Sequence, residues 1–288
     1  MGAKTVLPSC GVTERAVPDF SLAQICDSGQ CFRMAQKDSS TYTVTAGDRY
    51  LEITQEGVKC TFHCPEDEFD CFWKHYFDLD RDYKEYKERI SSRDTYLSQA
   101  AQFGEGIRIL NQDLWEMTVS FLISQQNHIA RIRRCIQNIS EKYGEKKQVP
   151  DGTVYYAFPS AEVLAGLSED GLKDCNLGYR SKYVVRTARS VANGDVLLGD
   201  IQKMPYREAR EELLKLFGVG EKVADCICLF ALHHLEAFPV DTHISQALKA
   251  HYPKGFPSRR YKGMQGVMQQ YIFYYELKGK KEVQIPQG

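Results

Sequence analysis

The first hundred residues contain short runs in which apolar and polar positions alternate. Between positions 42 and 62 these runs are interrupted at Gly47-Asp48 and at Glu56-Gly57, two pairs typical of turns. Alternation with a period of two, broken by turn residues, predicts an antiparallel meander. Pro65 and three acidic residues then mark a helix start. This helix has an aromatic stripe at helical spacing, formed by Phe69, Phe72, Trp73, Tyr76 and Phe77. We therefore predict a sheet with a helix packed on it.

Beyond about residue 100 the apolar positions follow helical spacing instead. One stripe comprises Leu114, Met117, Phe121 and Leu122, and a second comprises Ile129, Ile132, Ile136 and Ile139. A chain of 288 residues is long enough for two domains with a core each. We expect an α+β domain with an antiparallel sheet over residues 1–102, followed by an all-α domain over residues 103–288.

A glycine-containing turn between two segments with apolar stripes predicts a helical hairpin. Pro205 begins the first helix, whose apolar face contains Ala209, Leu213, Leu216 and Phe217. Gly218-Val219-Gly220 ends this helix and a second one begins at once, so we expect a turn of about three residues. The glycines leave backbone N–H groups bare at the start of the second helix, which suits a phosphate group. An ordinary helix corner remains an alternative explanation of this pattern.

Two ionisable residues near the hairpin are candidates for catalysis. Lys222 lies in the first turn of the second helix, where the helix dipole is positive and acidic residues are preferred. At that position the neutral amine, which is the form that acts as a nucleophile, is favoured. Cys226 follows one helical turn later and can lie beside the amine. The alternatives are a solvated lysine that contacts phosphate and a packed thiol.

Asp241 precedes a further helix, in the segment Phe238-Pro239-Val240-Asp241-Thr242-His243. It is placed to cap that helix, which is the simplest reason for an Asp at this position. Its carboxylate can also face a cationic centre on a bound substrate. A lysine amine, a carboxylate and a phosphate-binding hairpin together suit attack at a sugar C1′.

Charge is balanced over the whole chain but not along it. Thirty-seven Lys and Arg residues against 38 Asp and Glu residues give a net charge of -1, which excludes nucleic-acid binding through a basic tail. Residues 1–100 carry 12 basic and 17 acidic side chains, residues 101–200 carry 12 and 12, and residues 201–288 carry 13 and 9. The helical half is therefore neutral to basic, and it can meet phosphate locally.

The ten cysteines lie within apolar patterns, as buried free thiols do, and do not indicate disulfides. Cys60, Cys64 and Cys71 with His63 and His75 form one cluster to weigh for a metal. It lacks a paired Cys-x-x-Cys, so core packing is the simpler explanation. No apolar run is long enough to cross a bilayer, and the chain does not start with an apolar signal segment. We expect a soluble, intracellular protein, cytoplasmic if it is prokaryotic.

The hairpin and the segment around Asp241 resemble the helix-hairpin-helix DNA glycosylases with a Gly/Pro-rich loop and Asp, and among them the 8-oxoguanine DNA glycosylases. The resemblance is carried by Leu216-Phe217-Gly218-Val219-Gly220-Glu221-Lys222-Val223-Ala224-Asp225-Cys226-Ile227-Cys228-Leu229 and Pro239-Val240-Asp241-Thr242-His243, with Phe217 where the family usually has Pro. It implies Lys222 and Asp241 as the catalytic residues. It also implies a TATA-binding-protein-like first domain and DNA contacts from Gly218, Val219, Gly220 and His243.

Two further segments resemble the family's pocket for the damaged base. Ser28-Gly29-Gln30-Cys31-Phe32-Arg33 resembles the segment whose glycine carbonyl accepts the N7–H of 8-oxoguanine, a role that falls to Gly29. Ordinary guanine has a bare acceptor at N7, so two acceptors would oppose each other. In the other segment, residues 266–273, Gln269 would read the Watson–Crick edge and Phe273 would stack on the base, with Cys226 on the opposite face. A turn glycine, an exposed Gln and a core Phe are the plain alternatives.

The resemblance also assigns residues to the gap that the flipped base leaves in the duplex. They lie in residues 124–131 and 177–180 and are Gln126, Asn127, Arg131, Tyr179 and Arg180. Gln126, where better-known eukaryotic members carry Asn, and Tyr179 would act as wedges. Arg131 and Arg180 would contact the orphaned cytosine. Without the resemblance, these arginines and this tyrosine would be surface residues.

The implied activity is that of a bifunctional DNA glycosylase and abasic-site lyase. It would flip 8-oxoguanine, opposite cytosine, out of double-stranded DNA, excise it by Lys222 attack at C1′ and cleave the strand by β-elimination. The resemblance implies a monomer that needs no metal or organic cofactor and no membrane. A monofunctional alkylpurine glycosylase is one alternative, for which Asp241 alone would suffice. A non-catalytic helix-hairpin-helix DNA-binding module is another, and it needs neither Lys222 nor Asp241.

Overall fold

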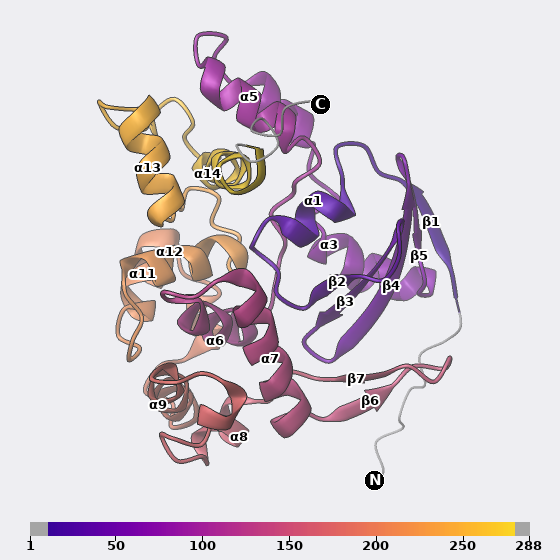
Figure 1. The fold of residues 1–288 in the computed structure, drawn as a ribbon, viewed down its shortest axis with the longest axis vertical. Helices are drawn as coiled ribbons and strands as arrows, with labels where there is room; N and C mark the ends of the chain where they lie inside the picture. The colour runs from indigo at the N-terminus through magenta and orange to yellow at the C-terminus, as the bar shows by residue number, and fades with distance from the viewer. Residues whose placement is uncertain (1–10, 280–288) are drawn as a thin grey trace, which may run out of the picture.

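A five-stranded antiparallel sheet forms the first part of the protein, as seen in a computed structural model that describes residues 11–279 (Figure 1). The sheet order is β1-β5-β4-β3-β2. Its strands are β1 (Thr13–Ala16), β2 (Met34–Gln36), β3 (Thr41–Ala46), β4 (Arg49–Glu56) and β5 (Lys59–Phe62). Turns at Gly47 and Gly57, both with positive φ, join the three central strands. This confirms the predicted meander, whereas the short strands β1 and β2 were not predicted because each has too few residues to show alternation.

One face of the sheet is covered by aromatic side chains from the predicted helix. That helix is continuous, with a π-helical turn, η1 (Phe69–Trp73), between two short α-helical segments, α2 (Glu66–Glu68) and α3 (Lys74–Tyr76). Phe69, Trp73 and Phe77 are buried against Phe62 of β5 and its neighbours. The helix α1 (Leu22–Asp27) packs into the same core through Leu22 and Ile25. The spacing of the aromatic residues thus predicted both the helix and its buried face.

Helices make up most of the remaining chain. Their bounds are α4 (Tyr83–Glu88), α5 (Thr95–Phe103), α6 (Leu114–Ser124), α7 (Ile129–Tyr143), α8 (Ala161–Ala165), η2 (Lys173–Cys175), α9 (Arg180–Ala192), α10 (Leu198–Ile201), α11 (Tyr206–Leu213), α12 (Glu221–Phe230), α13 (Thr242–His251), α14 (Gln265–Tyr274) and η3 (Tyr275–Gly279). They surround a second hydrophobic core, to which the two predicted stripes of α6 and α7 contribute. Between residues 11 and 279 no helix combines the length and the apolar character that crossing a membrane requires.

The two parts of the fold share a broad boundary. Leu97 and Ala100 of α5 belong to the helical core, while Leu110 belongs to the core beneath the sheet. A domain boundary between residues 102 and 103 therefore stays a prediction. Residues before it pack into the helical core, and a residue after it packs into the core beneath the sheet. The sheet and helices meet around a buried ion pair between Arg33 and Glu116, whose side chains are 6% and 5% exposed.

A two-stranded arm that the sequence did not predict extends from the helical part to the sheet. Its strands are β6 (Lys146–Gln148) and β7 (Val154–Tyr156), and Figure 1 shows it running along the edge of the first part. Lys147 pairs with Asp48 at 3.0 Å, and the Tyr155 hydroxyl donates to the Asp48 carbonyl at 3.0 Å. The arm therefore holds the two parts together near the turn between β3 and β4.

The predicted hairpin is present, but its first helix is shorter than expected. Helix α11 ends at Leu213, so residues 214–220 rather than about three residues connect it to α12. Backbone N–H groups of Lys215 and Leu216 bond to carbonyls three residues earlier, which tightens the chain out of the α-helix. As a result Leu216 stays buried while Phe217 turns outward against Tyr183.

Candidate active site

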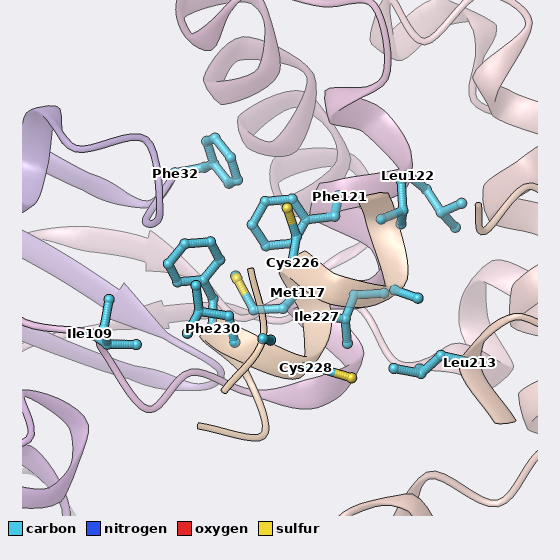
Figure 2. Close-up of a cluster of buried hydrophobic side chains, with 14 of the residues drawn as sticks. Phe32, Ile109, Met117, Phe121, Leu122, Leu213, Cys226, Ile227, Cys228 and Phe230 are labelled. Carbon is cyan, nitrogen blue, oxygen red and sulfur yellow. The ribbon is translucent and has the colours of Figure 1, made fainter. Parts of the chain in front are cut away.

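A cavity lies where the two parts of the fold meet. Its volume is about 880 Å³, which is within the range of roughly 300–1,000 Å³ found for small-molecule sites. It is lined by residues from the chain after α1, from α6, α7 and the loop between them, from α12, from the start of α13, and from α14 and η3. Three of the lining residues are phenylalanines, shown in Figure 2. The ring centroid of Phe121 lies 5.7 Å from that of Phe32 and 5.6 Å from that of Phe230.

Lys222 lines this cavity from the first turn of α12. Its Nζ lies 5.5 Å from the centroid of the Phe121 ring. The two carboxylates nearest to it in sequence have another partner: Glu221 and Asp225 pair with Arg210 of α11 at 3.5 and 2.7 Å. Gly220 caps α12 without any side-chain hydrogen bond, so the first N–H groups of the helix have no side-chain acceptor at the cap. The amine is thus left to the cavity, beside a helix start that suits an anion.

Cys226 lies one turn further along α12, as its spacing predicted, and also lines the cavity. Burial raises the pKa of the Cys226 thiol, and the positive charge of Lys222 beside it opposes that shift. The thiol is therefore neutral at ordinary pH. A neutral, buried and polarisable group on a cavity wall suits contact with a flat ring.

Asp241 faces the same cavity from the start of α13. Its Oδ1 accepts a hydrogen bond from the N–H of Ile244 at 2.8 Å, which is an N-cap. The predicted cap is therefore confirmed. Because the side chain is half-buried and lines the cavity, its charge is also available to a positive centre that forms there. Lys222 and Asp241 come together from the starts of two different helices.

Gly29 and Phe273 form a close contact on the cavity wall. Gly29 has φ +75°, a conformation that favours glycine, and a Cβ at this position would lie 3.0 Å from Phe273 Cε1. Phe273 belongs to α14, and the edge of its ring meets the ring of His243 with centroids 5.8 Å apart. The positive φ and the short distance to Phe273 therefore both favour glycine at position 29. This is the residue that the sequence predicted to read the base.

Gln269 presents an unused hydrogen-bond acceptor at the cavity. The side chain is 4% exposed, and its Nε2 donates to the Pro239 carbonyl at 3.1 Å. Its Oε1 is buried and has no hydrogen-bond partner among the described residues. A buried acceptor without a partner is destabilising by roughly 1–3 kcal/mol, and a ligand donor would relieve that cost. The edge of a nucleobase carries such donors.

The loop between α6 and α7 places the predicted wedge at the mouth of the cavity. Gln126 is exposed with φ +47°, a left-handed conformation that non-glycine residues rarely adopt. Asn127 folds back, and its Nδ2 donates to the Ile123 carbonyl at 3.1 Å. Arg131 is exposed and donates to the Asn176 carbonyl at 3.2 Å, next to the segment that contains Tyr179. Two loops distant in sequence are thus joined beside the cavity.

Arg180 occupies a different environment from the one its predicted role requires. It is 5% exposed, and its guanidinium donates to the carbonyls of Gln125 at 2.8 and 2.6 Å and of Gln126 at 3.0 Å. It also stacks over the ring of Tyr179, which is itself 47% exposed. In this structure Arg180 supports the strained Gln126, and contact with a base requires it to leave these carbonyls.

The three residues of the glycine turn, Gly218-Val219-Gly220, differ in whether they line the cavity. Gly220 lines the cavity, whereas Gly218 and Val219 do not. Gly218 has φ +89°, and a Cβ there would lie 2.7 Å from Tyr183 Cγ. Its carbonyl accepts a hydrogen bond from Gln125 Nε2 at 3.0 Å, so the turn also supports the loop that contains Gln126.

Several cavity residues were not predicted from the sequence as site residues. Phe121 carries the signal of a core helix stripe, and Phe32 and Gln125 lie beside predicted residues without a pattern of their own. No grouping of three or more His, Cys, Asp or Glu side chains within residues 11–279 is arranged to hold a metal ion. Of the cysteines weighed for a metal, Cys60 and Cys64 are buried and Cys71 is exposed.

Two family models together match most of the chain. Residues 13–118 match the 8-oxoguanine DNA glycosylase N-terminal domain, and residues 119–260 match the HhH-GPD superfamily base excision DNA repair protein. An N-glycosylase/DNA lyase of Saccharomyces cerevisiae is 37% identical over 159 residues, which cover 51% of this chain and 42% of the yeast protein. The chain thus matches less than half of that relative's length.

Two further relatives match over a larger share of their length. A probable N-glycosylase/DNA lyase of Methanothermobacter thermautotrophicus is 30% identical over 244 residues, which cover 75% of this chain and 77% of that protein. The crystal structure of an 8-oxoguanine glycosylase/lyase of Clostridium acetobutylicum, in complex with double-stranded DNA containing cytosine opposite 8-oxoguanine, superposes with a TM-score of 0.86 at 38% identity. That superposition covers 94% of this chain and 98% of the bacterial one.

Proposed function

Because the chain belongs to the 8-oxoguanine DNA glycosylases of the HhH-GPD superfamily, we propose that it excises 8-oxoguanine from double-stranded DNA and then cleaves the abasic strand. One observation carries the proposal: Lys222 and Asp241, from the starts of two helices, line a single cavity with Gly29. The first two residues supply the chemistry of glycosidic cleavage, and the third supplies an acceptor for the lesion. We expect the protein to act as a monomer.

In the proposed mechanism the Lys222 amine attacks C1′ of the flipped nucleotide. The N-glycosidic bond breaks, and its electron pair leaves with the base, which takes up a proton. The carboxylate of Asp241 stabilises the positive charge that develops on the sugar. Loss of a proton from the amine and opening of the sugar ring give a Schiff base between Lys222 and C1′. Removal of a C2′ proton then expels the 3′ phosphate, which is the β-elimination.

The proposed base recognition uses one hydrogen bond that guanine cannot make. The Gly29 carbonyl would accept the N7–H of 8-oxoguanine, whereas the bare N7 of guanine would face it as a second acceptor. The free Oε1 of Gln269 would accept from a donor on the Watson–Crick edge. Phe273 and Cys226 would then contact the two faces of the base, consistent with their positions on the cavity wall.

The residues around the cavity mouth would hold the duplex. The uncapped N–H groups at the start of α12, with the turn Gly218-Val219-Gly220 and His243, would contact phosphates. Gln126 and Tyr179 would fill the gap in the stack, supported by Asn127. Arg131 would reach the unpaired cytosine, and Arg180 would join it after releasing the carbonyls of Gln125 and Gln126.

The test is a trapping experiment on duplex oligonucleotides with 8-oxoguanine opposite each of the four bases, with and without borohydride. We expect a covalent protein–DNA adduct in the wild type and none in Lys222→Gln. Lys215→Gln is the matched control, because this exposed hairpin lysine pairs with Glu212 outside the cavity. Base release without an adduct would indicate a monofunctional glycosylase, and binding without release would indicate a DNA-binding module. Either result would contradict the proposal.

A further inference from the structure

The segment Ser28–Gln30, here named the recognition segment, is held on both sides by buried glutamines. Gln270 Nε2 donates to the Ser28 carbonyl at 2.6 Å, and Gln112 Nε2 donates to the Gln30 carbonyl at 2.9 Å. For the Gly29 carbonyl between them, no hydrogen-bond partner occurs within residues 11–279. Both neighbouring carbonyls are thus occupied, and the middle one is left as an acceptor.

The two glutamines connect the recognition segment to different helices of the second part. Gln270 lies on α14 and is 2% exposed. Gln112 is 7% exposed, and it also binds the Phe230 carbonyl at the end of α12, through its backbone N–H at 3.2 Å and its Nε2 at 3.4 Å. Since Lys222 lies in the first turn of α12, Gln112 bridges the recognition segment and the helix that carries the amine.

Gln30 completes the attachment with its own side chain. Its Oε1 accepts from the N–H of Leu110 at 2.9 Å, and its Nε2 donates to the Arg108 carbonyl at 2.8 Å and to Ser28 Oγ at 3.0 Å. The side chain is fully buried. The bonds to Leu110 and Arg108 join the side chain to backbone atoms, so they restrain the path of the main chain.

We propose that Gln112 and Gln270 are positioning residues that set the location and direction of the Gly29 carbonyl relative to Lys222. The inference rests on the proposed function. Glycine is the most flexible residue, and Gly29 has φ +75°, so its own backbone defines the carbonyl poorly. Hydrogen bonds to the peptide units before and after it remove that freedom. Recognition by a single directional hydrogen bond requires this, because a displacement of about 1 Å can cost roughly a hundredfold in rate.

The consequence is a separation of two steps of the same enzyme. Excision of 8-oxoguanine needs the Gly29 carbonyl in place, whereas β-elimination at a pre-formed abasic site has no base to recognise and needs Lys222. Loss of a glutamine contact should therefore slow excision more than β-elimination. A glutamine that only stabilised the fold would lower both rates in proportion, through the fraction of folded enzyme.

The experiment compares single-turnover excision of 8-oxoguanine with β-elimination at a pre-formed abasic site, for Gln270→Met and Gln112→Met. We expect excision to fall about tenfold in each variant, with β-elimination within about twofold of the wild type. Gln55→Met is the control, since Gln55 bonds to the backbone of Phe20 and Leu22 within the first part only. The ratio of the two rates does not depend on how much enzyme folds, so a destabilised variant remains informative.

A second measurement tests whether the glutamines act through Gly29. The effect of Gln270→Met on the activation free energy of excision is measured in the wild type and in a Gly29→Ala background. We expect the effect in the Gly29→Ala background to be less than half of the effect in the wild type. An unchanged ratio of the two rates in both variants, or full additivity with Gly29→Ala, would overturn the inference. If the wild type itself neither excises the base nor forms an adduct, it is the proposed function that fails.

Discussion

The cavity has two walls that are built in different ways. We name the two walls after the roles proposed above. The catalytic wall comprises Lys222 and Asp241, each positioned at the start of its own helix. The recognition wall comprises Gly29, Gln269 and Phe273, positioned by contacts between distant segments; the bond from Gln270 to Ser28 joins residues 242 positions apart. The first wall depends on local geometry and the second on how the two parts of the fold dock. Chemistry and selectivity should therefore respond differently to mutation.

The largest effect is expected on the catalytic wall, from Asp241→Asn. Asn caps a helix as well as Asp does, so unfolding free energy should change by less than about 0.5 kcal/mol. Excision should fall by roughly 10²–10³-fold, because the charge that stabilises the oxocarbenium is lost. Asp241→Ala removes the cap as well and should destabilise the protein by about 1 kcal/mol. Single-turnover kinetics and urea denaturation of both variants separate the two roles. Full activity in the Asn variant would mean that Asp241 acts only as a helix cap.

On the recognition wall Gly29→Ala should have a smaller and more selective effect. The added Cβ meets Phe273 Cε1 at 3.0 Å and the backbone must hold φ +75°, so the carbonyl shifts. We expect excision of 8-oxoguanine to fall by about tenfold or more, with near-normal β-elimination at an abasic site. Gly57→Ala is the matched control: φ is +61°, and no atom lies within 4 Å of the added Cβ. An equal loss in both variants would mean that backbone strain, not lesion contact, explains the result.

A smaller effect is expected outside both walls, from Arg131→Ala. Its exposed guanidinium would contact the unpaired cytosine, and loss of a base contact at the low end of the usual range costs about 1 kcal/mol, or about fivefold. The ratio of excision opposite cytosine to excision opposite adenine should fall by that factor. Arg134→Ala, an exposed arginine of the same helix, should leave the ratio unchanged. A uniform loss opposite all bases would assign Arg131 to phosphate contact instead.

The smallest effect tests how tightly the thiol of Cys226 is packed in the cavity. Burial raises the pKa of the Cys226 thiol, so less thiolate exists at pH 8 than for an ordinary cysteine. Iodoacetamide should therefore modify Cys226 more slowly than the exposed Cys71, and the rate should rise as the pH passes above the usual thiol range. Peptide mass spectrometry after a time course measures both sites. Equal rates would show that the cavity around Cys226 opens readily to solvent.

Elements with strong periodicity could be predicted from the sequence, and irregular ones could not. The meander, the aromatic helix and the stripes of α6 and α7 all showed in the spacing of apolar residues. The arm β6–β7 has three residues in each strand, too few for a period to appear. The end of α11 was placed too late, because Leu216 and Phe217 continue the apolar spacing although the chain there has already left the helix.

The sequence by itself determined that Lys222 and Asp241 stand at the starts of two helices, since an Asp before a helix and a Lys after a glycine turn are read from adjacent residues. It also indicated Gly29, although only through a resemblance, because a single glycine has no period. Only the tertiary structure decided that Gln112 and Gln270 hold the recognition segment and that Arg180 binds the carbonyls of Gln125 and Gln126. The physical reason is that a hydrogen bond between distant segments leaves no spacing in the sequence, whereas a helix end does.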